Sequence, residues 1–274
     1  MPELPEVETI RRGLDIHLPG KALQCVDIRY TGSLKAPSAD ILQAELPGRR
    51  ITGTGRRGKY LLLHLDDGSV IVVHLRMTGR LVYSEGEAEC DKHTHLVFVF
   101  NDSSTLAFSD VRKFGTIWWL PGERLSEISG LAKLGPEPLS ADFHFPYLNK
   151  EIEKRTINIK ALLLNQEFVA GLGNIYADEI LHRAAIKPER SARTLDKRER
   201  QALFTAIREV LAEAIEWRGT TMNDYRDSSG SLGQFQERLQ VYRRHEKECP
   251  RCGTAICRTT VAGRGTHYCP ACQH

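Results

Sequence analysis

The hydrophobic pattern starts as a helix and changes to β-strands after about residue 22. The helix-spaced apolar positions are Val7, Ile10, Leu14 and Leu18. Pro19-Gly20 then ends that helix. Runs rich in Val, Ile, Leu and aromatic residues follow at 60–65, 69–75, 79–83, 95–100, 105–109 and 115–120. No helix-length amphipathic pattern separates these runs, so the pattern predicts a β-sandwich or barrel rather than a doubly wound sheet.

Helical spacing returns after a proline-rich connection. Residues 132–149 contain three prolines and are predicted to be a linker. Helical patterns follow around 159–168, 176–183 and 195–217, and the polar stretch 220–233 is typical of a mobile loop. We therefore predict four segments: a β domain over 1–131, the linker over 132–149, a helical domain over 150–235 and a small cysteine-rich tail over 236–274.

Charge is nearly balanced over the whole chain but not along it. The 274 residues include 38 Lys+Arg and 35 Asp+Glu, a balance that excludes an acidic scaffold or a polybasic coat protein. Residues 1–149 carry 17 basic and 19 acidic side chains, whereas residues 150–274 carry 21 and 16. The excess beside the C-terminal cysteines fits a phosphate-facing surface, with a solvated surface rich in arginine as an equal alternative.

The expected environment is a reducing cytosol. No basic-then-apolar leader opens the chain, and no apolar run approaches the roughly 18 residues that a membrane span needs. The seven cysteines are an odd number and are scattered, which is not the pattern of a secreted disulfide framework. No heptad or apolar stripe suggests self-association, so we expect a soluble, cytoplasmic monomer.

Four of the cysteines have the spacing of a zinc site. Cys249-x2-Cys252-x16-Cys269-x2-Cys272 supplies two CxxC pairs joined by a segment of hairpin length. Four thiolates complete a tetrahedral ion and leave no open position for water, so we predict one structural Zn²⁺ and no organic cofactor. His267 is a less favoured substitute ligand. What the hairpin contacts is not decided by the spacing.

A glycine-rich turn lies between two predicted helices. Gly171-Leu172-Gly173-Asn174 lacks the third glycine of a dinucleotide-binding loop, and Tyr176 stands in its place. A tight turn with a second helix starting near Asn174 fits better. The exposed N–H groups of such a helix start can bind phosphate, although a plain helical hairpin is equally compatible.

The amino terminus offers a candidate nucleophile. Removal of Met1 would leave Pro2 with a free secondary amine, whose pKa near 8 is well below the 10.4 or so of lysine. Such an amine attacks aldehydes to give iminium ions, and the neighbouring Glu3 could donate a proton. Many proteins begin Met-Pro, however, so these residues alone prove little.

Taken together, these segments resemble the formamidopyrimidine-DNA glycosylase family of bacterial base-excision repair enzymes. The matching motifs, in order, are MPELPEVET at the start, RRGKYLL at 56–62, HLRMTG at 74–79, FSDVRKFG at 108–115, LGPEPL at 134–139, GLGNIYADE at 171–179 and the four-cysteine tail. The resemblance implies an α+β multidomain fold: an N-terminal β-sandwich edged by a helix, a helix–two-turn–helix domain and a C-terminal C4 zinc finger.

The resemblance also implies a function and a site. The chain would be a bifunctional glycosylase and abasic-site lyase that removes oxidised purines, namely 8-oxoguanine and formamidopyrimidines, from damaged double-stranded DNA. Pro2 would form the Schiff base with C1′, Glu3 would protonate the opening sugar, Lys59 would serve the glycosylase and β-elimination steps, and Arg264 would grip phosphate for δ-elimination. The implied DNA contacts are His74, Met77, His93, Arg112, Phe114, Arg155, Lys160, Asn174 and Tyr242.

Three of those contacts have chemistry suited to a flipped nucleotide. Extruding a base costs a few kcal/mol and leaves a void in the duplex. Met77 and Phe114 are apolar wedges, and Arg112 can donate to the orphaned base, expected to be cytosine. Without the resemblance, the apolar character of Met77 and Phe114 would favour the core. The motif 108–115 departs from the family at Val111 and Lys113, where proline and arginine are usual.

Two other functions stay open. An endonuclease VIII-like enzyme would favour oxidised pyrimidines, but that branch typically begins MPEGPE and lacks the Met, Arg and Phe trio, so Leu4 and Met77 argue against it. A zinc-ribbon DNA-binding protein could keep the fold without the chemistry. The presence of Pro2, Glu3 and Lys59 argues against that alternative.

Overall fold

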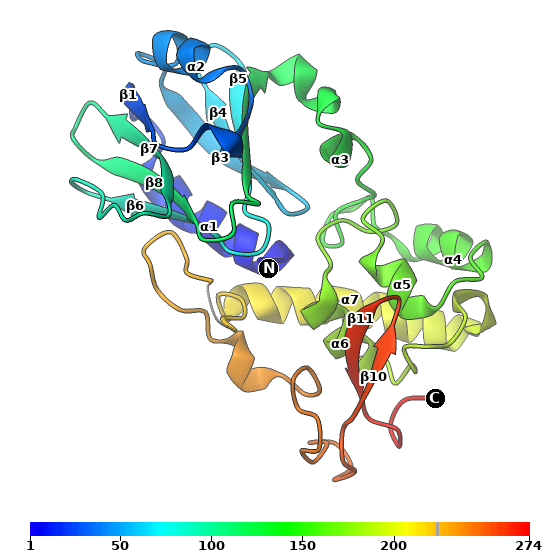
Figure 1. Ribbon diagram of the computed structural model, residues 1–274. Helices are drawn as coiled ribbons and strands as arrows, with labels where there is room; N and C mark the ends of the chain where they lie inside the picture. Colours follow the sequence, from blue (N-terminus) through cyan, green and yellow to red (C-terminus); the bar gives the residue numbers. More distant parts are fainter. Residues whose placement is uncertain (223–224) are drawn as a thin grey trace. The chain divides into compact units, whose positions relative to one another are not determined.

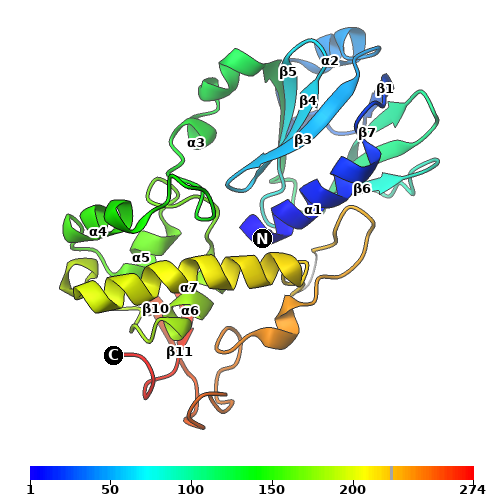
Figure 2. The same cartoon turned by 180° about the vertical axis from the view of Figure 1, so that it is seen from behind.

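The computed structural model describes residues 1–222 and 225–274. The chain divides into two compact units, shown in Figures 1 and 2. The sandwich unit contains residues 1–132 and 217–236, and the helical unit contains residues 133–216 and 237–274. Segment 217–236 thus groups with the sandwich unit, whereas we had expected it in the helical domain. The domain boundaries themselves stay predictions.

Two sheets enclose one core in the sandwich unit, which confirms the predicted β-sandwich. The four-stranded sheet has the order β1 (Leu23–Ile28), β7 (Thr94–Phe100), β8 (Thr105–Asp110) and β6 (Gly79–Ser84). The five-stranded sheet has the order β2 (Leu34–Ala36), β9 (Thr116–Pro121), β5 (Ser69–His74), β4 (Tyr60–Leu65) and β3 (Ile51–Arg57). Each of the six predicted strands is present with bounds shifted by no more than a residue or so.

Three α-helices and two 3-10 helices are also described in this unit. They are α1 (Leu4–His17), η1 (Thr31–Ser33), α2 (Ala39–Glu45), η2 (Gly122–Glu127) and α3 (Ser129–Ala132). The apolar face of α1 packs into the core with Leu23 of β1, Leu61 of β4 and Phe108 of β8. Helix α2 forms over seven residues ahead of the predicted strand runs, in a stretch where we predicted no element. We also did not predict β1, β2 and β3.

Segment 217–236 is attached to the start of α1. The backbone N–H of Thr220 donates to Glu6 Oε1 at 2.7 Å, and the Tyr225 ring is buried in the sandwich core. These contacts join two parts of the sequence that lie over two hundred positions apart. We expected the loop 220–233 to be mobile; Asn223 and Asp224 of that loop lie outside the described residues.

The helical unit is built around α6 and α7. Its elements are α4 (Phe145–Glu153), α5 (Ile159–Leu164), α6 (Asn174–Arg183), η3 (Ala192–Thr194), α7 (Lys197–Glu216), η4 (Phe235–Arg238, which begins in the other unit), β10 (Cys257–Val261) and β11 (Arg264–Tyr268). Leu163, Tyr176 and Leu211 are among its fully buried side chains. Helix α4 begins inside the predicted linker, because His144 Nδ1 caps it by accepting the Tyr147 N–H at 3.1 Å. Within 1–222 and 225–274, no helix is long and apolar enough to cross a membrane.

Candidate functional site

Pro2 and Glu3 lie at the start of α1 in the sandwich unit. Both are buried, and Glu3 is the N-cap residue of the helix. Its backbone N–H donates to Glu6 Oε2 at 2.7 Å in a capping box, a motif that fixes how the chain enters a helix. The backbone next to the candidate nucleophile is therefore held by α1.

The β3–β4 hairpin carries Lys59. Its two-residue turn is Gly58-Lys59, with Gly58 at φ 55°, a conformation that glycine adopts without cost. Glu8 of α1 accepts from Arg56 Nε at 3.1 Å, and Arg56 Nη1 donates to Gly58 O at 3.0 Å. This chain of contacts ties the turn to α1. Two elements that carry three predicted catalytic residues are thus joined by a partly buried ion pair.

His74 is buried at the end of β5 and is neutral. Burial, with the charges of Arg76 and Lys59, lowers its pKa to about 3. Its Nδ1 accepts the Arg76 N–H at 3.0 Å, and its ring packs edge-on against Tyr60 at 4.5 Å between centroids. His74 therefore supports the turn that follows β5, beside Lys59.

Met77, Arg112 and Phe114, which we call the wedge trio, gather at the surface of the sandwich unit. Met77 is 43% exposed and Phe114 is 50% exposed, so neither is a core residue, although apolar character alone would have favoured the core. Arg112 Nη1 lies 3.2 Å from Met77 Sδ, and its guanidinium lies 4.8 Å from the Phe114 ring centroid. His93 is close by, because its carbonyl accepts the Asp110 N–H at 2.9 Å.

Asn174 and Arg264 meet at one place in the helical unit. Asn174 begins α6, and its Nδ2 donates to Gly265 O at 2.9 Å. Arg264 is exposed at the start of β11, directly after the Ala262-Gly263 turn, whose positive φ values of 51° and 70° suit a two-residue hairpin. The α6 start and the hairpin arginine thus come from segments ninety residues apart.

Lys160 does not lie at the surface. It is 0% exposed, and its Nζ donates to Asp178 Oδ1 at 2.6 Å and to Thr266 Oγ1 at 2.7 Å. A third contact to Gly265 O at 3.3 Å holds the carbonyl next to Arg264. Lys160 thus supports the hairpin from beneath, whereas we had expected it to contact DNA directly.

Tyr242 and Arg155 are both partly exposed. The Tyr242 N–H donates to Glu179 Oε1 at 2.8 Å, and its ring packs edge-on against His267 at 5.4 Å. Arg155 pairs with Glu151 at 3.3 Å. Of these two, Tyr242 belongs to the group around α6 and β11, whereas Arg155 follows α4.

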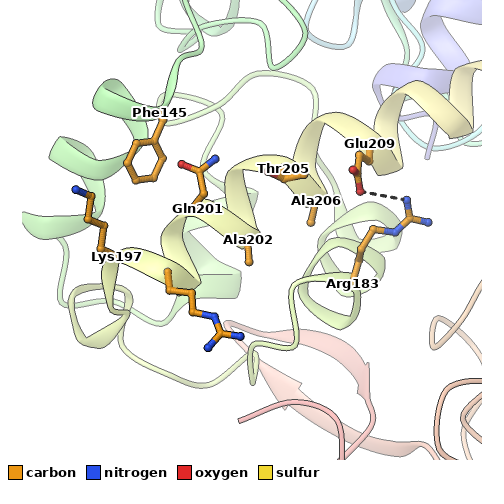
Figure 3. Close-up of a pocket in the computed structure, with 9 residues that line it drawn as sticks. Phe145, Arg183, Lys197, Gln201, Ala202, Thr205, Ala206 and Glu209 are labelled. Carbon is orange, nitrogen blue, oxygen red and sulfur yellow. Dashed lines mark ion pairs between the residues drawn. The ribbon is translucent and has the colours of Figure 1, made fainter.

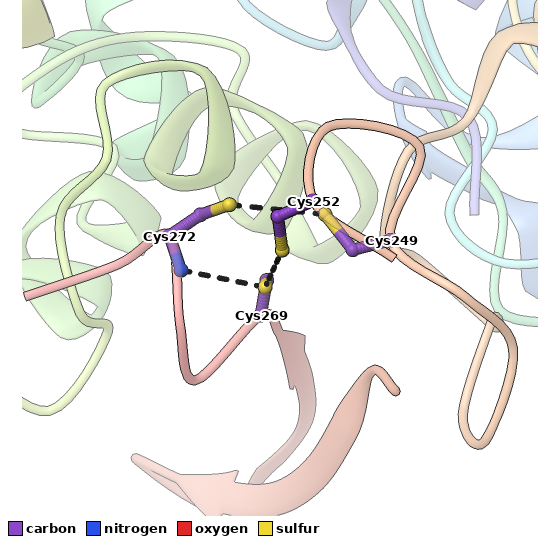
Figure 4. Close-up of side chains that lie close together, drawn as sticks. All are labelled: Cys249, Cys252, Cys269 and Cys272. Atoms are coloured by element: carbon purple, nitrogen blue, oxygen red, sulfur yellow. Dashed lines mark hydrogen bonds between the residues drawn. The ribbon is translucent and has the colours of Figure 1, made fainter. Parts of the chain in front are cut away.

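The four tail cysteines converge as a metal site (Figure 4). Their Sγ atoms all lie within 4.8 Å of one another, with 3.9 Å from Cys249 to Cys272 and 3.5 Å from Cys252 to Cys269. Tetrahedral zinc with Zn–S bonds of about 2.3 Å requires S···S distances near 3.8 Å, so the donor set fits Zn²⁺. The chain therefore has one structural zinc site, and His267 is not part of it.

A histidine lies directly behind the zinc site. His182 of α6 is buried with its Nε2 3.4 Å from Cys249 Sγ. Groups that touch a metal ligand from outside orient it and tune its charge. The sequence offered no signal for this contact, since 67 positions separate the two residues.

A surface groove in the helical unit is separate from these residues. It lies between α4, the end of α6 and one face of α7, with Phe145 and the Arg183–Glu209 ion pair among its lining (Figure 3). No residue that we predicted for the site lines it. The groove is therefore not the candidate site.

Three protein-family models match successive parts of the chain. They are the formamidopyrimidine-DNA glycosylase N-terminal domain over 1–117, the H2TH domain of the same enzyme over 134–226, and a zinc finger found in FPG and IleRS over 246–274. A formamidopyrimidine-DNA glycosylase from Pelotomaculum thermopropionicum is 49% identical over 273 residues, covering 100% of this chain and 99% of the relative. The chain belongs to the formamidopyrimidine-DNA glycosylase family. Membership makes it a DNA glycosylase with an associated abasic-site lyase activity.

Solved structures of this family have the same fold. The Lactococcus lactis Fpg in complex with DNA containing an abasic site is 39% identical, with a TM-score of 0.93 and coverage of 99% of each chain. The MutM protein of Thermus thermophilus is 44% identical, with a TM-score of 0.90 and coverage of 99% and 98%. The predicted multidomain architecture is thereby confirmed.

Sequence reasoning missed three carboxylates of this family member. Asp110, Asp178 and Glu179 are buried and accept backbone N–H groups from segments that carry predicted site residues. Each lies inside a motif that we quoted, FSDVRKFG or GLGNIYADE. The motifs were signals, but their acidic residues gave no reason to expect burial.

Proposed function

We propose that the chain excises oxidised purines such as 8-oxoguanine and formamidopyrimidines from duplex DNA and then cleaves the strand by β,δ-elimination. The observation that carries the proposal is Pro2, buried directly before α1 and followed by the N-capping Glu3. Without Met1, the Pro2 nitrogen is a secondary amine with the low basicity of an α-amino group. It is nucleophilic near neutral pH, when a lysine is almost fully protonated.

The proposed reaction begins at the sugar. The Pro2 nitrogen attacks C1′ of the damaged nucleotide, and the C1′–base bond breaks as the base departs with the bonding electron pair and takes up a proton. Glu3 protonates the ring oxygen as the ring opens, which leaves an iminium between Pro2 and C1′. Lys59, held by the β3–β4 turn, assists this step and the proton transfers that follow.

Strand cleavage follows from the iminium. Loss of a C2′ proton expels the 3′ phosphate, and a second elimination expels the 5′ phosphate. Water then hydrolyses the iminium and regenerates the amine. Arg264 binds phosphate for the second elimination. The zinc is structural when bound and supplies the fold of the hairpin that carries Arg264.

The other contacts grip the duplex. The wedge trio fills the void left by the extruded nucleotide, with Arg112 donating to the opposite cytosine. His74, His93, Arg155, Asn174 and Tyr242 bind the backbone. The substrate is damaged double-stranded DNA, and we place the protein as a monomer on the bacterial chromosome in the cytoplasm.

A trapping experiment tests the nucleophile. Protein confirmed by mass spectrometry to lack Met1 is incubated with an 8-oxoguanine:cytosine duplex, reduced with borohydride and digested. We expect a covalent adduct on the peptide that begins at Pro2, absent in Pro2→Gly. Pro5→Ala is the matched control, because it removes another proline of the same helix start and should trap DNA normally.

Three results would contradict the proposal. An adduct mapped to Lys59 in the unsubstituted protein would replace Pro2 as the nucleophile. No adduct from Met1-free protein would remove the Schiff-base mechanism altogether. A thymine-glycol duplex that is trapped far better than 8-oxoguanine would change the substrate class to oxidised pyrimidines.

A further inference from the structure

A single buried carboxylate holds both turns that present the wedge trio. Asp110 ends β8 and is 0% exposed. Its Oδ1 accepts from the Thr78 hydroxyl and from the Arg112 N–H at 3.1 Å. Its Oδ2 accepts from the N–H groups of Phe114 at 2.8 Å and Gly115 at 2.6 Å. These four donors belong to two separate turns, 75–78 and 111–115.

The donors are the trio or its direct neighbours. Arg112 and Phe114 are themselves members, and Thr78 follows Met77. Strand pairing places both turns at the same end of the β6–β8 pair, since Gly79 at the start of β6 is opposite Asp110 at the end of β8. An ionised carboxylate is an acceptor with about four lone-pair positions, so it satisfies four donors that no neutral side chain could satisfy together.

The backbone of both turns is strained. Arg76 has φ 54° and Lys113 has φ 58°, left-handed values that are unfavourable for residues with a Cβ. Such conformations persist only where surrounding contacts hold them. Asp110 supplies those contacts directly on the 111–115 turn, and through Thr78 on the other turn.

The side chains of the trio contact one another. Arg112 contacts both Met77 Sδ and the Phe114 ring, although Met77 and Phe114 are exposed. Exposed side chains normally sample several rotamers, and fixing them on binding costs conformational entropy. A wedge whose backbone is fixed beforehand has a smaller entropy cost when it enters the duplex.

We propose that Asp110 is a positioning residue that preorganises the wedge trio for nucleotide extrusion. This inference rests on the proposed function, because it assigns a cause to the insertion step of that reaction. Asp110 does not touch the sugar or the base. Its loss should therefore impair excision from a paired duplex far more than strand cleavage where no base needs to be extruded.

Two substrates separate these effects. The first is an 8-oxoguanine:cytosine duplex, and the second is a single-stranded oligonucleotide with a preformed abasic site. For Asp110→Asn, the amide NH₂ would face N–H donors, and we expect kcat/KM on the duplex to fall by about tenfold or more. Cleavage of the single strand should stay within about threefold of the unsubstituted protein.

A second variant covers the case in which Asp110→Asn fails to fold. Thr78→Val keeps the shape but removes the hydroxyl that donates to Asp110 and accepts from the Arg112 N–H at 3.3 Å, so duplex excision should fall by about threefold while the protein stays folded. Asp67→Asn is the matched control, because Asp67 also accepts from backbone and hydroxyl donors, those of Ser69, but lies at the opposite end of β5 from the Met77 turn. It should match the unsubstituted protein on both substrates.

A fluorescent reporter of insertion completes the test. With 2-aminopurine beside the lesion, both Asp110→Asn and Thr78→Val should slow the rise in fluorescence that accompanies unstacking. Unchanged duplex excision in both variants, or an equal fall on both substrates, would overturn the role of Asp110. An unsubstituted protein that processes neither substrate would instead contradict the proposed function itself.

Discussion

At the residue scale, buried acidic side chains act as anchors for loop backbone. Asp110 accepts three N–H groups, Asp178 accepts the His267 N–H at 2.9 Å, and Glu179 accepts those of residues 240–242 at 2.8–3.0 Å. A buried charge is unfavourable unless it is hydrogen-bonded. Burial raises the pKa of Glu179, and its three N–H donors offset this only in part. Each anchor thus holds one backbone segment: the 111–115 turn, strand β11 or residues 240–242.

His74 makes stability depend on pH. In the folded state its pKa is about 3, whereas an unfolded histidine titrates near 6.5. Below about pH 6.5 the unfolded state therefore binds a proton that the folded state does not, and the free energy of unfolding falls as pH falls. The side chain of His74→Asn can still accept the Arg76 N–H but does not titrate. Below about pH 6.5, the free energy of unfolding of this variant should therefore fall less steeply with pH than that of the unsubstituted protein, by up to about 1.4 kcal/mol per pH unit.

Urea unfolding at pH 7, 6 and 5 measures the slope. The exposed His245→Asn is the control, and its stability should follow that of the unsubstituted protein at every pH. Parallel pH profiles for His74→Asn and the unsubstituted protein would show that His74 is not held neutral.

At the element scale, α6 holds the β10–β11 hairpin in place within the helical unit. Asn174 and Asp178 contact Gly265 and His267 of β11, and Glu179 holds segment 240–242. Lys160 of α5 completes the arrangement by neutralising Asp178 at 2.6 Å. The hairpin is thus oriented by one helix face together with one buried ion pair.

Breaking that pair on one side should be costly. Lys160→Met leaves the Asp178 charge buried without its partner, and we expect about 3–5 kcal/mol lost from the free energy of unfolding of the helical unit. The double variant Lys160→Met with Asp178→Asn should recover at least half of this, because the charge is gone and an oxygen can still accept the His267 N–H. Denaturant unfolding monitored in the helical unit measures both. A double variant less stable than Lys160→Met alone would contradict the argument.

The elements that the sequence predicted are those with strong local patterns. Strands from residue 60 onward are apolar runs between turn pairs, and α7 has a long apolar face. In contrast, β3 contains two glycines and two arginines, and only its pairing with β4 makes it a strand. Strand β2 has three residues, and α2 has one buried side chain, so neither had a periodic signal.

The site residues show the same division. The spacing of the four cysteines predicted the zinc site directly, whereas the roles of Pro2 and Glu3 came from the family resemblance and stay predictions. Lys160 was expected at the surface, but its partners are 18 and 106 positions away, and no local pattern encodes them. The role of Asp110 was missed because its hydrogen-bond donors come from the 75–78 turn as well as from the adjacent 111–115 turn. Burial of a charged residue is a tertiary property, so the structure was needed to find it.

At the scale of the whole molecule, the zinc site and the sandwich core are independent sources of stability. Around the zinc site, the buried core consists of Val241, Cys249, Ile256 and Cys269, with the half-buried Cys272 packed against it. This core is too small to hold the segment folded without the ion. Chelation should therefore raise amide hydrogen exchange across 246–274 and abolish DNA binding, while the sheets of the sandwich unit stay protected. Cys257→Ser, which alters a cysteine outside the site, should bind DNA normally. Simultaneous loss of protection in both regions would contradict this.

The whole-chain charge of +3 is small, so affinity for DNA depends on which cations reach phosphate rather than on their number. Each phosphate contact contributes about one to the slope of log K against log salt. Arg264 is exposed, so Arg264→Ala should lower that slope by about one. Lys160 is buried and neutralised by Asp178, so the double variant Lys160→Met with Asp178→Asn should leave the slope unchanged, even if affinity falls. Titrations from 50 to 200 mM salt, roughly the range over which such slopes are resolved, compare the two. An equal reduction in slope for both would mean that Lys160 reaches DNA after all.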